Sequence, residues 1–263
     1  MKKLLSLVLA LCLVFALAAC GGNIEDVVAP TDATEESRGT LVVGMTIYEP
    51  MNYEDENGEL TGFDTEFAKA FADKAGFDGV EFIEIDWGTK FIALEAGEFD
   101  CVWNGMTITD EAKANASVSN PYVKNAQVVV TTAEKAAELT SADALSGLTV
   151  AAEMGSAGAS AVTDSGVECN LVEVDVQTTA LLQVVAGKAD ACVIDITMAQ
   201  SMLKEGTDFD SLAIAMELTS EEYGVAFKKG SPLVDEFNTI MAELMADGTL
   251  DALAEKYTLA LVK

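Results

Sequence analysis

The residue best suited to binding a charged ligand is an aspartate that directly follows an apolar run. Asp195 comes after Cys192, Val193 and Ile194, a segment typical of a buried strand. A carboxylate at the end of such a strand is costly unless it is paired. Two interpretations stay open at this point. The carboxylate pairs with a cationic group of a ligand, or it caps a helix that begins at Ile196.

Polar and aromatic residues also follow other apolar runs. The pair Gly155-Ser156 stands where a helix is expected to begin, and free N–H groups there can bind an anion or simply form a helix cap. The segment Asn104–Thr107 follows a further expected strand. Tyr48 and Trp87 lie near the same edges, and Trp87, in a loop, is the better candidate for an exposed aromatic face.

The elements that must position these residues alternate between apolar runs and helical patterns. The expected strands are 41–45, 80–85, 100–103, 148–152, 171–174 and 190–194. The expected helices are one capped by Asp64, then 89–96, a helix starting within 155–161, and 178–186. This β-α-β-α-β order occurs twice, which predicts two similar α/β lobes with mostly parallel sheets and helices on both faces.

The remaining segments connect or close these lobes. Residues 132–147 are expected to form a polar, alanine-rich helix and turn, and strands at 127–131 and 223–227 are natural crossovers between lobes. An amphipathic helix pair over 234–257 is expected to pack on the core. Because ligands of open α/β sheets bind beyond the carboxyl ends of the strands, the two lobes should enclose one small molecule in a cleft.

Composition excludes several classes of function. The 263 residues include 44 acidic and 15 basic side chains and no histidine, which gives a formal charge of −29. Nucleic acid and large polyanions are therefore excluded as partners. The absence of histidine excludes Ser–His–Asp and Cys–His catalysis and the commonest transition-metal ligand. We expect no catalytic residues, no metal and no cofactor.

The N-terminus is typical of an export signal. Lys2 and Lys3 precede an apolar run, Leu4–Ala19, that is slightly short for the alternative, a transmembrane helix. Leu17–Cys20 resembles the lipobox of bacterial lipoproteins, which implies cleavage before Cys20 and lipid on its sulfur. Residues 20–39 are predicted to form a flexible tether.

The three remaining cysteines cannot all be paired with one another. Cys101 and Cys192 lie in apolar, strand-like segments and are expected to be buried free thiols. A bridge between Cys169 and Cys192 stays open as an alternative.

Six short motifs give the chain a resemblance to a known family. They occur in family order across residues 40–258. The motifs are GELTGFD (58–64), GEFDCVWNGMTIT (97–109), SNPY (119–122), GKADACVID (187–195), EYGVAFKK (222–229) and ADGTL (246–250). Together they resemble the extracellular solute-binding proteins of polar-amino-acid ABC importers. The resemblance implies a periplasmic-binding fold with two lobes, two hinge strands and closure of the hinge onto a ligand.

The resemblance also implies roles for single residues. Tyr48 matches a wall of the binding site, and Trp87 matches a side chain that covers the ligand. The segment Asn104–Thr107 matches the part that hydrogen-bonds the ligand's carboxylate and amino group. Ser156 matches a residue whose N–H and hydroxyl reach the carboxylate, and Asp195 matches the acid that pairs with the ammonium group.

One family position does not match. Most members place an arginine after Met-Thr-Ile-Thr, where it clamps the ligand's α-carboxylate, but this chain has Ala112, and its single arginine, Arg38, lies in the tether. The lost contact, at about 1.5–3 kcal/mol per charge-assisted hydrogen bond, should weaken binding by about tenfold to a thousandfold. Three alternatives stay open: Lys113 substitutes as a point charge, the ligand lacks a free carboxylate, or binding is degraded. The expected site residues are Tyr48, Trp87, Asn104, Gly105, Met106, Thr107, Lys113, Ser156 and Asp195.

From the sequence we therefore expect a non-catalytic, monomeric, lipid-anchored binding protein of an ABC importer, exported and held at the membrane through Cys20. Its expected partners are a small amine-bearing solute, such as an amino acid or a relative, and an ABC permease. One alternative is a cyclohexadienyl-dehydratase-like enzyme, which would need a cationic group in the cleft to hold its substrate. The other is the ligand-binding lobe of a sensory protein. The expected domains are a signal peptide 1–19, a tether 20–39, a first lobe 40–127 plus 226–263, and a second lobe 128–225.

Overall fold

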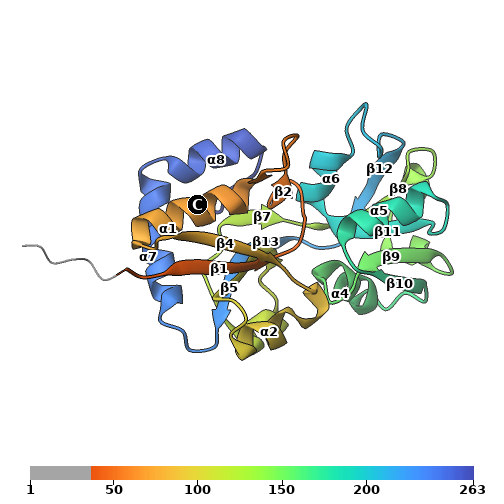
Figure 1. Ribbon diagram of the computed structural model, residues 1–263. Helices are drawn as coiled ribbons and strands as arrows, with labels where there is room; N and C mark the ends of the chain where they lie inside the picture. The colour runs from red at the N-terminus through yellow and green to blue at the C-terminus, as the bar shows by residue number, and fades with distance from the viewer. Residues whose placement is uncertain (1–36) are drawn as a thin grey trace, which may run out of the picture. The chain divides into compact units, whose positions relative to one another are not determined.

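The computed structural model describes residues 37–263, which form two main sheets with helices packed on them (Figure 1). The predicted signal peptide 1–19, the predicted lipid site Cys20 and most of the tether 20–39 lie outside the described residues. Within residues 37–263, the helices are all too short or too polar to cross a membrane.

The first sheet follows the strand order β4-β1-β5-β13-β6, and β7 also pairs with β13. Strand β1 is parallel to β4 and β5, whereas β13 is antiparallel to its neighbours. The strand expected at 100–103 continues to Thr107, because its second half pairs with β13. The strands are β1 (Thr40–Met45), β4 (Gly79–Glu84), β5 (Cys101–Thr107), β6 (Ala116–Val118), β7 (Val123–Asn125) and β13 (Glu221–Lys228).

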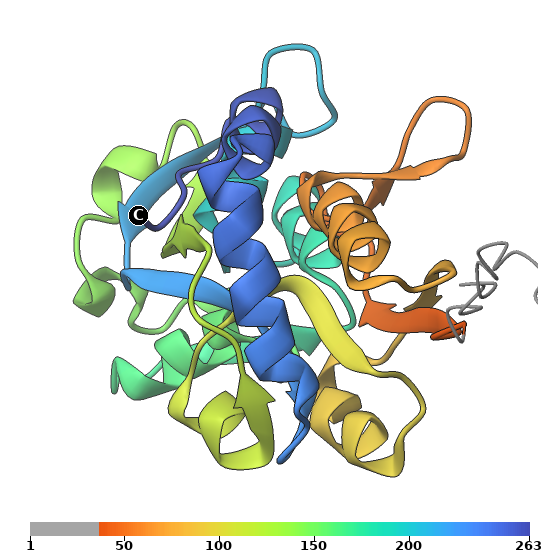
Figure 2. The ribbon, with the colours of Figure 1, turned by 90° about the vertical axis from the view of Figure 1, so that its left-hand side faces the viewer.

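Helices cover both faces of the first sheet. Helix α1 (Phe63–Ala75) packs with α7 (Leu233–Ala246) and α8 (Thr249–Tyr257) on one side, and Figure 2 shows α7, in blue, running beside the orange α1. Helix α2 (Lys90–Ala96) packs on β5 and β13. The core between α1 and α7 is aromatic, with the Trp103 ring 4.8 Å from that of Phe67 and 5.0 Å from that of Phe237. The predicted amphipathic helix pair at the C-terminus is confirmed.

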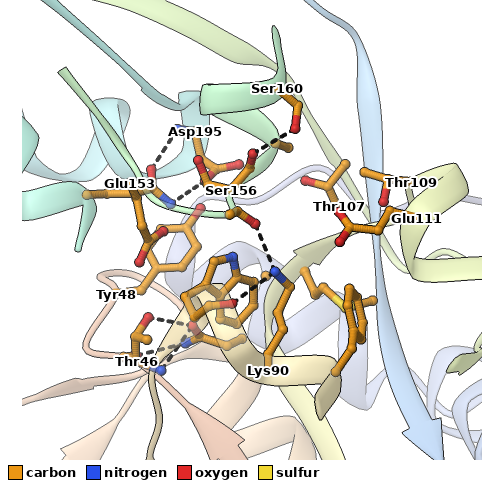
Figure 3. A pocket seen from close by; sticks show the side chains of 18 of the residues that line it. Thr46, Tyr48, Lys90, Thr107, Thr109, Glu111, Glu153, Ser156, Ser160 and Asp195 are labelled. Atoms are coloured by element: carbon orange, nitrogen blue, oxygen red, sulfur yellow. Dashed lines mark hydrogen bonds between the residues drawn. The ribbon is translucent and has the colours of Figure 1, made fainter. Parts of the chain in front are cut away.

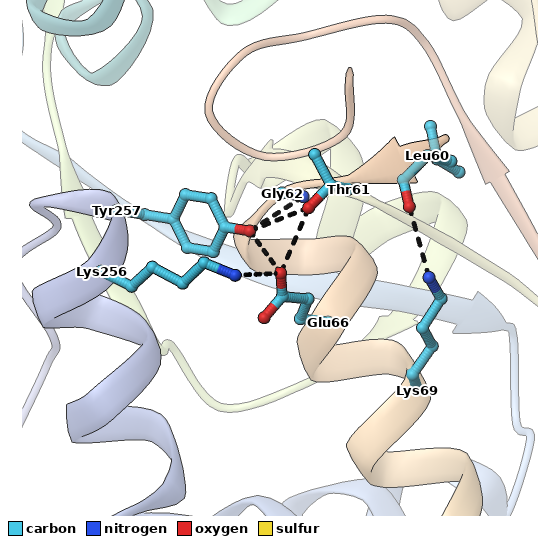
Figure 4. A network of polar contacts seen from close by, with 7 residues as sticks. All are labelled: Leu60, Thr61, Gly62, Glu66, Lys69, Lys256 and Tyr257. Carbon is cyan, nitrogen blue, oxygen red and sulfur yellow. Dashed lines mark hydrogen bonds and ion pairs between the residues drawn. The ribbon is translucent and has the colours of Figure 1, made fainter. Parts of the chain in front are cut away.

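A polar network holds α8 on α1 at the edge of this core (Figure 4). The Tyr257 hydroxyl and the Lys256 ammonium donate to Glu66 Oε1 over 2.5 and 2.6 Å. Thr61 also donates to Glu66, and its strand β3 (Leu60–Thr61) pairs with β2 (Tyr53–Glu54). The two helices and the small hairpin before α1 therefore form one unit beside the first sheet.

The second sheet follows the order β10-β9-β11-β8-β12. Its strands are β8 (Gln127–Thr132), β9 (Thr149–Glu153), β10 (Asn170–Val174), β11 (Ala191–Asp195) and β12 (Leu212–Glu217). Successive side chains of β11 point to opposite faces of the sheet, as in any β-strand, and each face has its own apolar cluster. Cys192 and Ile194 pack with α5 (Gln177–Val185) and α6 (Ile196–Met202), whereas Val193 shares a cluster with Val162 of α4 (Ala157–Asp164). The predicted two-lobe α/β fold is thereby confirmed.

The chain passes between the sheets twice, at Ala126 and at residues 218–220. The two passages lie side by side, since Leu218 N donates to Gln127 O over 2.7 Å and Gln127 N donates to Thr219 Oγ1 over 2.9 Å. The strands expected at 127–131 and 223–227 are present, but each belongs to one sheet, and the hinge consists of the short segments beside them. The change of sheet before β13 falls earlier than the expected boundary at 225/226.

The expected helix over 132–147 is wrong. Two short 3₁₀ segments occupy this region instead, η2 (Ala136–Glu138) and η3 (Ala142–Leu145). Leu139 and Leu145 are both buried in the same apolar cluster. On an α-helix these two side chains would lie about a third of a turn apart, so one helix could not turn both into that cluster. The irregular backbone allows both leucine side chains to be buried in this cluster.

The expected cap by Asp64 is also wrong. Gly62, at φ 121°, precedes α1, and the first helical N–H groups are satisfied by backbone carbonyls, with Phe63 N donating to Pro50 O and Asp64 N to Met51 O. A Cβ at Gly62 would lie 2.2 Å from Met51 O, so only glycine allows this approach. Asp64 is thereby free to turn its carboxylate into the protein.

The cysteines follow the first of the two interpretations of the sequence. Cys101 and Cys192 are buried free thiols, as predicted. Cys169 is also free, so the alternative Cys169–Cys192 bridge is wrong.

Candidate functional site

A cavity of about 300 Å³ lies where the carboxyl ends of strands from both sheets meet (Figure 3). Its size is at the lower end of ordinary small-molecule pockets. All of the sequence-predicted site residues except Lys113 line it. The lining residues from the first-sheet side are Thr46, Tyr48, Trp87, Lys90, Phe91, Asn104, Gly105, Met106, Thr107, Thr109, Asp110 and Glu111. Those from the second-sheet side are Glu153, Gly155, Ser156, Ala157, Ser160, Asp164, Gln177 and Asp195.

Asp195 is buried at the end of β11. Its carboxylate makes no capping bond to α6, so the helix-cap interpretation is wrong. It accepts from the side-chain amides of Asn125, Gln127 (2.8 Å) and Gln177. Two of these donors use Oδ1 and one uses Oδ2, which leaves one acceptor position on Oδ2 for another donor. Burial first, and then the charge of Glu221, raises the pKa of Asp195 to about 7.

The amides that hold Asp195 also hold a second carboxylate at the hinge. Asn125 and Gln127 both donate to Glu221 Oε1, over 2.7 and 2.8 Å. Thr107 Oγ1 donates to the same oxygen over 2.7 Å. The network therefore runs from the first-sheet strand β5, through the hinge segments, to the cleft acid on the second sheet.

Gly105 brings the backbone of β5 close to the cleft. Its φ is 54°, and a Cβ there would lie 2.7 Å from the ring of Tyr48, so glycine is required. Its N–H donates over 2.6 Å to the inward-facing Asp64 Oδ2, which also accepts from the Tyr122 hydroxyl over 2.9 Å. Burial raises the pKa of Asp64 to about 7. Asp64 is thus a positioning residue for the cleft.

Replacing Asp64 with alanine is expected to reduce the free energy of unfolding by about 2–4 kcal/mol, because it leaves the buried Gly105 N–H and Tyr122 hydroxyl without an acceptor. Urea denaturation at pH 7.5 measures this change. Asp73→Ala, which removes an exposed acid from the same helix, is the matched control and should change the free energy of unfolding by less than about 0.5 kcal/mol. Equal effects of the two substitutions would contradict this role of Asp64.

The side chain of Asn104 makes its hydrogen bonds within the protein. Its Nδ2 donates to Thr46 O and Asn52 Oδ1, both over 2.8 Å, and its Oδ1 accepts from the N–H and hydroxyl of Thr46. The amide is therefore fully used in holding the loop after β1. The contribution that Asn104 can offer a ligand is its backbone and its place in the wall.

Ser156 forms the ordinary helix cap that the sequence left open. Its Oγ accepts from Ala159 N over 3.1 Å at the start of α4, and its own N–H donates to Glu153 O over 3.2 Å. The hydroxyl proton remains a donor toward the cavity. The N–H that the resemblance assigns to a ligand carboxylate is used within the turn.

Tyr48 and Trp87 are both buried and both line the cavity. The 3₁₀ turn η1 (Trp87–Thr89) packs in an apolar cluster, so Trp87 is shielded from bulk solvent, and a face offered to a ligand in the cavity stays a prediction. The Tyr48 hydroxyl shares hydrogen bonds of 2.5 Å with Thr197 Oγ1 of α6 and with the Tyr223 hydroxyl. Tyr48 therefore joins the two sides of the cleft.

Lys90 provides the cationic group of the cavity wall. Its side chain is 6% exposed, and its ammonium donates to Trp87 O over 3.1 Å and to Gly155 O over 2.8 Å (Figure 3). The ammonium also lies 4.7 Å from the centroid of the Trp87 ring, within the range of a cation–π contact. Desolvation lowers the pKa of Lys90 to about 8. Two carbonyl acceptors leave one N–H for a ligand.

Lys113 lies apart from the cavity lining. It is exposed, lies beside a separate hollow with Lys124 and Glu222, and is not among the residues that line the cavity, so its contact with a ligand stays a prediction. Its helix α3 (Asp110–Asn115) begins at a cap by Thr109 and turns this residue away from the cleft. Ala112 is 1% exposed in the apolar cluster that contains Trp87 and Met106. Arg38 is bound elsewhere, in a two-pronged contact with Glu236.

Among the lining residues that the sequence analysis missed, Lys90 and Glu153 are the two that are both charged and buried. Glu153 follows the apolar run of β9, which is the same signal that identified Asp195. Lys90 has no comparable signal, because its burial depends on a carbonyl 65 residues away in the chain. In residues 37–263 no group of three or more acidic or cysteine side chains is arranged to hold a metal ion.

Comparison with known proteins gives this cleft its context. The sequence matches the profile of bacterial extracellular solute-binding proteins, family 3, over residues 41–260. The arginine-binding extracellular protein ArtP of Bacillus subtilis (strain 168) is 30% identical over 98% of both chains. The L-cystine-binding protein TcyJ of Escherichia coli (strain K12) is 31% identical over 84% of both chains.

Solved structures give the same result. An ancestral arginine-binding protein bound to arginine has a TM-score of 0.77 and 35% identity, covering 84% of this chain and 98% of that one. The ancestral amino acid-binding protein AncCDT-1, a precursor of cyclohexadienyl dehydratase, also has a TM-score of 0.77, with 33% identity over 84% and 96% of the chains. Sequence profile, relatives and fold agree on a solute-binding role, and the chain belongs to family 3 of the bacterial extracellular solute-binding proteins.

Proposed function

We propose that this chain is the solute-binding component of an ABC importer and that it captures a small amine-bearing solute in the cleft between its lobes. The observation that carries this proposal is the buried carboxylate of Asp195, which is held by three amides and lines the cavity. An ammonium group is a fitting partner for such an acid, because a buried charge needs a countercharge. The named relatives bind arginine and L-cystine, which both carry an α-ammonium group.

Binding is coupled to closure of the two lobes. Several side-chain contacts join the sides of the cleft, among them Tyr48 with Thr197, Lys90 with Gly155, and Ser201 with Glu49. A solute that contacts both sides adds to these bonds and shifts the population toward the closed form. The closed form then docks on a membrane permease and delivers the solute.

The place of action follows from the N-terminus. We propose export, removal of residues 1–19 and lipid attachment at Cys20, so that a monomer is anchored to the outer side of the cell membrane. The chain between Cys20 and Gly39 then acts as the tether. Mass spectrometry of the membrane fraction tests this step, with Cys20→Ser as the variant that should be released from the membrane.

A thermal-shift screen of the exported chain against amino acids, amines, sugars and anions tests the proposed capture of an amine. An amine-bearing ligand at 100 times its Kd stabilises the folded state by about 2.7 kcal/mol. For a domain of this size we expect a rise in Tm of about 5–11 °C. A Tm raised by a neutral sugar or an anion, and by none of the amines, would contradict the proposal.

The enzyme alternative has one supporting observation, since Glu153 is a cleft acid whose pKa burial raises to about 8. A raised pKa is suited to a general acid. However, Lys90 is the one cationic side chain among the residues that line the cavity and could hold a carboxylated ring. The similar structure AncCDT-1, a precursor of cyclohexadienyl dehydratase, is itself described as amino acid-binding. Incubation with prephenate or arogenate under ultraviolet monitoring is expected to show no turnover.

A further inference from the structure

Glu153 is a buried acid without a partner at the wall of the cavity. It ends β9, its side chain is 3% exposed, and within residues 37–263 its Oε1 has no hydrogen-bond partner. An unpaired buried polar atom costs free energy comparable to a lost hydrogen bond. Asp195, by contrast, accepts from the side-chain amides of Asn125 and Gln177. Glu153 therefore lacks the donor that a ligand could provide.

Glu153 and Asp195 are neighbours in the second sheet. Strands β9 and β11 are parallel and adjacent, and each ends with an acid at the edge that borders the cavity. The register that places Ala151 opposite Cys192 places Glu153 beside Ile194, one residue before Asp195. Figure 3 shows both acids at the wall of the same pocket. The charge of Asp195 raises the pKa of Glu153 further, beyond the larger effect of burial. Two acids thus face one small cavity.

The cavity contains too little positive charge to balance them. Its charged lining residues are Lys90, Asp110, Glu111, Glu153, Asp164 and Asp195. The Lys90 ammonium is committed to two backbone carbonyls and makes no ion pair with Glu153 in the described part of the chain. A solute with one ammonium group would satisfy Asp195 and leave Glu153 unpaired. A solute with two would satisfy both.

From this geometry we propose that Glu153 is a specificity-determining residue, and that Asp195 and Glu153 together select a small solute with two cationic groups. This assignment rests on the proposed function, because it assumes that the cleft captures an amine. Two kinds of small solute carry two cationic groups, a diamine and a diamino acid. They differ in the carboxylate, for which the free N–H of Lys90 is available.

Isothermal titration calorimetry at pH 7.5 tests the assignment with matched solutes. Ornithine is compared with norvaline, and 1,4-diaminobutane with butylamine, so that each pair differs by one ammonium group. The wild type should bind the dication more tightly than its partner by about tenfold to a hundredfold in at least one pair. The pair that shows the preference identifies the source, a diamino acid or a diamine.

Glu153→Gln should remove this preference while leaving the binding of the monocation within about threefold of wild type. Glu173→Gln, which neutralises an exposed acid of the neighbouring strand β10 outside the cavity lining, is the matched control and should keep the preference. Since the Glu153 side chain supports no described hydrogen bond, the variant should fold, and its Tm without solute verifies this.

The outcomes separate the two proposals. Equal affinity of the wild type for norvaline and ornithine, and for butylamine and diaminobutane, would overturn the role of Glu153 and leave amine capture intact. A preference that survives Glu153→Gln would also overturn it. If none of the four solutes binds the wild type while a sugar or an anion does, the proposed function itself fails.

Discussion

Asp195→Asn is expected to abolish the capture of amine-bearing solutes, with affinity reduced by about a hundredfold to a few thousandfold. Removing one partner of a buried charge pair costs about 3–5 kcal/mol, and 1.4 kcal/mol corresponds to one decade in Kd. The asparagine keeps the shape and one acceptor oxygen of the aspartate, so the loss reports the charge together with the hydrogen bond that the amide nitrogen cannot accept. Isothermal titration calorimetry with the solute found in the thermal-shift screen measures the change.

The pH dependence of binding gives this substitution a second readout. The ammonium group pairs with the ionised form of Asp195, whose pKa is raised to about 7. Affinity should therefore be full above pH 7 and should fall by up to about tenfold per pH unit as the pH decreases below it. Asp195→Asn should bind weakly with a much flatter pH profile below 7.

Asp164→Asn is the matched control, because Asp164 also lines the cavity but is exposed to solvent. It should bind within about threefold of wild type, since exposed charge pairs contribute about 0–1 kcal/mol. A Kd unchanged in Asp195→Asn, with the variant folded by its circular dichroism spectrum, would exclude Asp195 as the ammonium partner.

The success of the sequence in finding this aspartate has a physical cause. A charge at the end of an apolar strand conflicts with burial, and such local conflicts concentrate at functional sites. The two lobes could also be predicted, because the periodicity of a strand or a helix is a local property of its own residues. Helix 178–186 and strand 190–194 depend on their own side chains and appear within a few residues of their expected bounds.

The features that could not be predicted from the sequence depend on contacts between residues far apart in the chain. Asp64 has the local signature of a cap, yet Gly105 and Tyr122 recruit its carboxylate from the other end of the lobe. Lys113 was a reasonable substitute by position in the chain, but the short helix α3 turns it toward another hollow. Lys90 reaches the cleft only because Gly155 of the other lobe offers its carbonyl. These assignments require the assembled lobes.

The cationic side chain of the cleft determines how a carboxylate can be bound without the family's arginine. Lys90 keeps one free N–H beside the cavity, and its ammonium lies over the rings of Trp87 and Phe91 on the first-sheet side. An α-amino acid placed with its ammonium on Asp195 can therefore direct its carboxylate toward Lys90. A simple amine gains nothing from Lys90 and is repelled by it. One substitution should affect the two classes of solute in opposite directions.

Lys90→Met is expected to weaken the binding of α-amino acids by about tenfold to a hundredfold, because a charge-assisted hydrogen bond to the carboxylate is lost. The same variant should bind simple amines and diamines more tightly, by about threefold to tenfold, because a like charge has been removed from a cavity of low dielectric constant. Methionine keeps the apolar stem that packs on Trp87, so folding should persist. Calorimetric titration with ornithine and 1,4-diaminobutane measures both changes on one sample.

Lys113→Met is the control that separates this explanation from the one drawn from the sequence. Lys113 is exposed and distant from the cavity lining, so its loss should leave both affinities within about twofold. The pKa of Lys90, lowered to about 8 by burial, adds an independent check. Amino-acid affinity should decrease as the pH rises through 8, since the neutral amine no longer pairs with a carboxylate. Loss of amino-acid binding in Lys113→Met, with Lys90→Met unchanged, would return the carboxylate site to Lys113.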